Sequence, residues 1–87
     1  THLPHAALQT ALQNLRRFPN LRCVLFTVFL SDAQGSARQP DGVVTDPDRP
    51  PYHVPEAAIR DTITQAGFTP TRLPTLLPRG QVLWSAT

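Results

Sequence analysis

The apolar positions of the chain divide it into five segments of different pattern. In residues 4–18, apolar side chains recur at helical spacing, at Leu8, Ala11, Leu12, Leu15 and Phe18. This spacing predicts an amphipathic helix that buries one face. Pro4 suits the first turn, where a missing N–H needs no partner, and Pro19 comes directly after the last apolar residue.

Residues 23–30 form a nearly continuous run of β-branched and aromatic side chains. A strand with one solvated face would alternate apolar and polar residues, so this run predicts a strand covered on both faces, as in a parallel sheet. Such a strand also needs a hydrogen-bonding neighbour along each edge. We expect Cys23, at its start, to be buried.

Residues 31–55 are rich in proline, glycine and aspartate and hold few apolar side chains. The pattern predicts a loop of unusual length. Structureless loops longer than about 12–15 residues in a compact domain are commonly functional lids or disordered segments.

Residues 55–67 predict a second helix. Pro55 and Glu56 open the segment, and Gly67 stands where a helix C-cap is expected. Ile59, Ile63 and Ala66 form its apolar stripe.

Two strands are predicted after this helix, at residues 68–73 and 81–86, with a turn signal at 78–80. Pro70 favours an edge position for the first, so we expect an antiparallel pair with residues 68–73 outermost. The fold class is therefore α/β, a layered sheet with a crossover helix. Two short helices give the apolar strand little cover, so residues 1–87 are interpreted as a single partial domain.

Composition narrows the classes of function. The chain has 87 residues, too few for two domains of ordinary size. Its one cysteine excludes a disulfide framework and fits a reducing compartment, so we expect a cytoplasmic location. No apolar run approaches the length of a membrane span, so no membrane partner is expected. All eight basic residues are scattered arginines without aromatic platforms, which disfavours nucleic-acid binding.

Several segments, taken in order, resemble class I S-adenosylmethionine-dependent methyltransferases. The opening Thr-His-Leu-Pro resembles the segment after the family's fourth strand, and Leu12-Gln13-Asn14-Leu15-Arg16-Arg17-Phe18 resembles the helix that follows it. Residues 24–30 are similar to the fifth strand. The run from Glu56 to Ala66-Gly67-Phe68 resembles the approach to the sixth strand, and Arg79-Gly80 with Val82-Leu83-Trp84 resembles the turn into the seventh.

This resemblance implies the C-terminal part of a Rossmann-like sheet. The fifth strand would be central, the sixth at the edge, and the seventh antiparallel between them. The family's glycine-rich cofactor loop has no counterpart, because Gly35 is the first glycine of the chain. Pro19-Asn20-Leu21-Arg22 also replaces the family's Pro-Gly-Gly turn. S-adenosylmethionine would be held by the full-length parent, and we expect this chain alone to be inactive.

The implied activity is methyl transfer to a small-molecule acceptor, and it selects candidate site residues. Thr1 and His2 would lie near the transferring methyl group, with His2 as a catalytic base because imidazole titrates near neutral pH. The alternatives for His2 are simple lining of the pocket and a helix-entry role. Residues 31–55 would cap the acceptor, with Tyr52 and His53 orienting it, although Tyr52 could instead anchor the loop.

Two more candidates come from position alone. Phe29 and Asp32 lie at the C-terminal end of the buried strand, the edge where open α/β sheets bind ligands. Asp32 could equally be a turn residue. The three histidines match no metal-ligand spacing, and His5 is expected to be solvated, so we predict no metal site.

The competing class of function is a small non-enzymatic α+β module that binds a protein partner. Such a module should unfold cooperatively as a monomer. A methyltransferase fragment should instead expose an apolar strand edge and self-associate through it. A nucleic-acid binder would show an affinity that falls steeply with salt.

Overall fold

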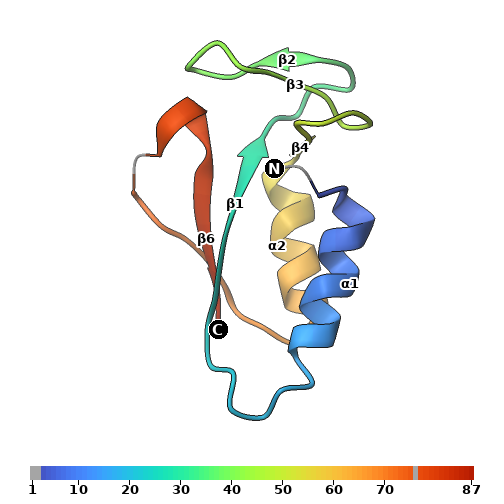
Figure 1. Cartoon of the computed structure of the whole chain (residues 1–87), viewed down its shortest axis with the longest axis vertical. Coiled ribbons are helices and arrows are strands. Elements are labelled where there is room, and N and C mark those ends of the chain that lie inside the picture. The colour runs from blue at the N-terminus through green and yellow to red at the C-terminus, as the bar shows by residue number, and fades with distance from the viewer. Residues whose placement is uncertain (1–2, 76) are drawn as a thin grey trace.

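The computed structural model describes residues 3–75 and 77–87, which form a small α/β domain (Figure 1). Its two α-helices are α1 (His5–Leu15) and α2 (Glu56–Gln65). The main sheet holds β1 (Val24–Leu30), β4 (His53–Val54), β5 (Pro70–Arg72) and β6 (Val82–Ala86). A separate two-stranded sheet pairs β2 (Ala37–Arg38) with β3 (Val44–Thr45).

The main sheet is mixed, with strand order β4-β1-β6-β5. β6 runs antiparallel to both neighbours, with Trp84 opposite Phe26 of β1 and Arg72 of β5. The predicted antiparallel pair is confirmed, with β5 as its outer member. The α/β class and the two predicted helices are confirmed as well.

Both helices cover the same face of the sheet (Figure 1). The alternate residues of β1 and β6 that point to this face join one apolar core with the helices. Its best-buried large side chains, each at most 1% exposed, are Leu12, Ile59, Ile63 and Trp84. Burial of these four supplies much of the hydrophobic stabilisation of the fold.

The prediction that residues 23–30 are covered on both faces is wrong. The residues of β1 that point away from the helices meet no second helix layer, and Leu25 is 61% exposed. Only Phe29, near the C-terminal end of the strand, is buried on that side. Cys23, expected to be buried, is exposed. The apolar run therefore predicts more burial than the side chains of this strand have in the structure.

The two edges of β1 also differ. Along one edge β6 pairs with five consecutive residues. Along the other, β4 pairs in parallel with Phe29 and Leu30 alone. In the part of the chain that the structure describes, no strand pairs with Val24–Val28 on that side.

Residues 31–55 are not the structureless loop that composition predicts. They contain the β2–β3 hairpin, in which Ala37 pairs with Thr45, and then β4, which joins the main sheet. Each of these strands is two residues long. A periodic apolar pattern cannot show in so short a segment, so the sequence gives no strand signal here.

Two glycines occupy the positions that the sequence predicts, one after α2 and one in the turn before β6. Gly67 follows α2 with a φ of 93°, the left-handed conformation common after a helix. Gly80, at a φ of 76°, lies in the turn before β6, where an added Cβ would be 2.9 Å from Cδ of Pro40. The Asp41 carboxylate accepts the backbone N–H of Arg79 in the same turn. The hairpin tip is thus fixed against the β5–β6 connection.

Candidate functional site

A hollow of about 250 Å³ lies at the C-terminal end of β1. Its lining comes from three elements that are distant in sequence: Leu30, Ser31, Asp32, Glu56 and Arg72. Open α/β sheets bind ligands at this edge because loops there diverge and leave backbone groups free. Asp32, one of the sequence candidates, is therefore in a position to contact a ligand.

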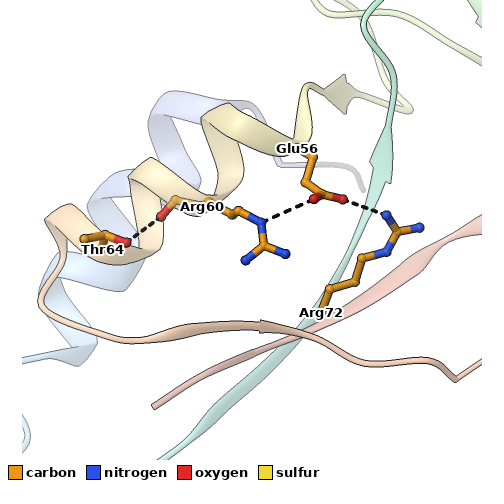
Figure 2. A network of polar contacts seen from close by, with 4 residues as sticks. All are labelled: Glu56, Arg60, Thr64 and Arg72. Atoms are coloured by element: carbon orange, nitrogen blue, oxygen red, sulfur yellow. Dashed lines mark hydrogen bonds and ion pairs between the residues drawn. The ribbon is translucent and has the colours of Figure 1, made fainter.

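Glu56 forms the charged wall of this hollow, between two arginines (Figure 2). Its carboxylate oxygens lie 2.6 Å from Arg72 Nη1 and 3.3 Å from Arg60 Nε. The hydrogen bond from Arg72, followed by that from Arg60, holds the pKa of Glu56 below its ordinary value. Glu56 thus stays ionised near neutral pH, which makes it a weak proton acceptor and a good clamp between α2 and β5.

Arg60 is positioned by its own helix and by the core. Its guanidinium lies over the Trp84 ring, 4.9 Å from the ring centre, and its backbone carbonyl accepts a 2.8 Å hydrogen bond from Thr64. A guanidinium stacked on an aromatic face gains a cation–π attraction while its N–H groups remain available to a carboxylate. The same side chain therefore links the buried core to the charged rim.

Asp32 differs from Glu56 because no side chain of the described residues bonds to its carboxylate. The neighbouring Ser31 hydroxyl accepts the backbone N–H of Ala33, a turn contact of 3.1 Å. The serine hydrogen is left free to donate. Together the two side chains offer a bound molecule one anionic acceptor and one hydroxyl donor.

His53, a second sequence candidate, lies in a buried polar network. Its Nδ1 is 2.7 Å from the Thr45 hydroxyl and its Nε2 is 3.1 Å from the Ala33 carbonyl. Gln39 donates to the same hydroxyl at 2.9 Å and to the Leu30 carbonyl at 3.3 Å. Because a carbonyl only accepts, Nε2 carries the ring hydrogen and Nδ1 accepts from Thr45. Both ring nitrogens are engaged, so His53 fixes the hairpin to the sheet.

The other candidates are more dispersed. Phe29 is 2% exposed and opposes His53 in the β1–β4 pair, and it is not among the residues that line the hollow. Tyr52 lines a small cavity of about 30 Å³ that it shares with Leu3 and Leu8 at the start of α1. Thr1 and His2 lie outside the described residues.

A larger hollow of about 430 Å³ lies on the other side of Arg72. Pro40 and Asp41 of the hairpin tip form one wall, and the β5–β6 connection forms the other. Arg72 therefore separates two concave surfaces along one edge of the sheet.

Sequence reasoning missed Glu56, Arg72 and the role of His5. Glu56 is visible only as a helix-opening residue, and Arg72 joins it through strand register. His5, expected to be solvated, is half-buried and its Nε2 lies 2.9 Å from the Thr62 hydroxyl. The contact between His5 of α1 and Thr62 of α2 depends on how the two helices pack, so no pattern in a single sequence predicts it.

Within residues 3–75 and 77–87, no three side chains of the metal-ligating kinds gather closely enough to hold an ion. The same residues contain no helix that is both long and apolar enough for a membrane span. No family model matches the chain, and no curated protein or solved structure shows a significant similarity to it.

Proposed function

We propose that this chain is the C-terminal part of a class I S-adenosylmethionine-dependent methyltransferase that acts on a small-molecule acceptor. The observation that carries the proposal is the place of β6, antiparallel between β1 and the edge strand β5. This is the order that the sequence resemblance implies for the fifth, seventh and sixth strands.

The residues of this chain do not fit the cofactor. Three glycines take a positive φ, and each stands alone in its segment. Gly42 lies in a loop turn, Gly67 follows a helix, and Gly80 precedes a strand. No strand-to-helix turn in the described residues carries the paired glycines of a cofactor loop. We therefore assign S-adenosylmethionine no contact in this chain and derive no step through it.

The role that we assign to this chain is to bind and orient the acceptor. The hollow at the end of β1 can hold a small molecule, with Asp32 and Ser31 as its polar contacts and Glu56 kept ionised by the arginines. Holding an acceptor in one orientation is the main requirement of a displacement at a methyl carbon. The tip of the β2–β3 hairpin lines the larger neighbouring hollow, which shares Arg72 with this one.

The test uses the reading frame that contains this chain. We expect it to continue upstream of Thr1 into a strand followed by a glycine-rich turn. The protein from the whole frame should bind S-adenosylmethionine with micromolar affinity by calorimetry, and the 87-residue chain should not. A frame without that turn, or micromolar binding by the 87-residue chain, would contradict the proposal.

A further inference from the structure

The larger hollow, between the hairpin tip and the β5–β6 connection, has the size of a small-molecule site. Its volume is about 430 Å³, within the range of about 300–1,000 Å³ that such sites have. The smaller hollow, at the end of β1, has about 250 Å³ and lies below this range. It therefore accommodates only part of an acceptor of ordinary size.

Both hollows open on the helix-covered face of the sheet. Side chains alternate between the faces of a strand, and Val82 of the larger hollow lies two residues before Trp84 of the core. Leu30, which lines the smaller hollow, packs against the same core. Arg72 is directly opposite Trp84 and lines both hollows. The two hollows are therefore neighbours on one surface, with the exposed Arg72 side chain between them.

The two charged side chains of the larger hollow already have partners. Nη1 of Arg72 lies 2.6 Å from the Glu56 carboxylate (Figure 2), and the Asp41 carboxylate accepts the backbone N–H of Arg79. A charged ligand group placed here would lose hydration without gaining a free counter-ion, so the hollow favours an uncharged group. Its remaining walls are mainly apolar: Pro40, Leu73, Pro74, Leu77 and Val82.

The larger hollow also contains uncharged polar groups. Thr75 and Gln81 add a hydroxyl and an amide to the lining, and both can orient an uncharged molecule by hydrogen bonds. Apolar walls with a few polar groups are typical of small-molecule sites. The contact of Asp41 with the turn before β6 holds the hairpin tip in place, so the hollow is formed before a ligand binds.

We propose that the larger hollow binds the uncharged apolar body of the methyl acceptor, and that the methyl-accepting end lies in the smaller hollow beside Ser31 and Asp32. This inference rests on the proposed function for the role of the ligand, and on the two hollows for its chemical class. The acceptor is an amphipathic small molecule that crosses the Arg72 side chain. Its polar end belongs in the smaller hollow, because the free carboxylate and hydroxyl are there.

The first test follows binding of benzyl alcohol and its longer-chain homologues to the 87-residue chain by NMR. Each has an uncharged ring and a polar end. We expect saturable shifts of the Leu77 and Val82 amides, with dissociation constants of about 1–10 mM for probes of this size. The longer homologues should also shift the Asp32 amide, because they reach the smaller hollow. Their affinity should rise by about fourfold for each further methylene that is buried.

A matched probe tests the preference for an uncharged body. The para-carboxylate of benzyl alcohol keeps the ring and the hydroxyl but adds a charge at the end of the ring that enters the larger hollow. We expect it to bind at least about tenfold more weakly than benzyl alcohol, since its carboxylate loses hydration there.

A pair of variants tests the location. Thr75→Asp adds a hydrated carboxylate to the wall of the larger hollow and should weaken binding of the alcohols at least about fivefold. Thr69→Asp is the matched control: Thr69 is also exposed but lines neither hollow, so this variant should bind as the wild type does. Circular dichroism should show that both variants keep the fold.

The inference would be overturned by any of four results: no saturable shift at Leu77 and Val82, no shift at Asp32 with any homologue, equal binding of the para-carboxylate, or equal losses in Thr75→Asp and Thr69→Asp. None of these readouts involves S-adenosylmethionine. Cofactor binding by the whole-frame protein without binding of the alcohols would overturn this inference and leave the proposed function standing. Binding of the alcohols without cofactor binding would overturn the proposed function, and with it the role of the ligand as a methyl acceptor.

Discussion

The two faces of the main sheet are covered in different ways. On one face α1 and α2 bury an apolar core in which Trp84, Ile59 and Ile63 are all fully buried. On the other face the described residues place no helix, and Phe29 is the one β1 side chain pointing that way that is buried, while Leu25 is exposed. The same strand therefore has one side buried in an apolar core and one side largely open to solvent. The hollow at the end of β1 belongs to the first side, because Glu56 of α2 and Arg72, the register partner of Trp84, both line it.

The largest expected effect comes from the helix-covered face. Trp84→Ala removes a fully buried ring and should lower the free energy of unfolding by about 3–5 kcal/mol. Leu25→Ala, on the neighbouring strand but on the open face, should change it by about 0.5 kcal/mol or less. Urea denaturation of dilute protein measures both. Similar losses for the two variants would mean that the open face is also packed.

An intermediate effect is expected from the polar network. Thr45→Val keeps the shape of the side chain but leaves His53 Nδ1 and Gln39 Nε2 without their shared partner. We expect a loss of about 1–3 kcal/mol, the cost of burying unsatisfied polar groups. Thr71→Val, at an exposed position of β5, is the control and should be close to neutral. An equal loss of unfolding free energy in Thr71→Val would mean that the effect comes from replacing any threonine and not from the buried network.

The smallest effect is expected at the rim, where Glu56 links α2 to β5. The pKa of Glu56 is lowered in the folded chain, so the ionised form contributes stability above its ordinary pKa of 4.5. That contribution is lost as the pH falls below this value and the carboxylate takes up a proton.

Glu56→Gln should therefore have a slightly lower thermal midpoint than the wild-type protein at pH 7. At pH 3 the difference between the two thermal midpoints should be smaller. Asp61→Asn, at an exposed position of the same helix, is the comparison variant and should show a smaller dependence on pH. A gap between Glu56→Gln and wild type that stays constant from pH 7 to pH 3 would contradict the role of the ion pairs.

The helices and the outer strand pair could be predicted because their signals are local. Apolar residues at helical spacing and a capping glycine define α2, and Pro70 alone directs β5 to an edge. The burial of β1 could not be predicted, since an apolar run cannot tell which face a helix will cover. Leu25 and Phe29 lie in the same run, yet one is exposed and the other buried.

The candidate site shows the same division. Asp32 could be found from its place after a strand, because strand ends of an α/β sheet are a general ligand position. Glu56 and Arg72 are 16 residues apart, and their contact depends on how α2 packs over β5. The sequence predicts that His53 orients an acceptor at the end of a loop, but it cannot show the two partners of the ring: Thr45 of a two-residue strand and Ala33 of the segment after β1.

The contact between Gly80 and Pro40 has a consequence for how this protein can vary. The hairpin tip and the β5–β6 connection meet so closely that neither a side chain at position 80 nor a shorter hairpin would leave the other unchanged. The Asp41 carboxylate adds a hydrogen bond across the same junction. Loop exchange designed to alter ligand preference should therefore move residues 37–45 and 78–80 together, as one transferable unit.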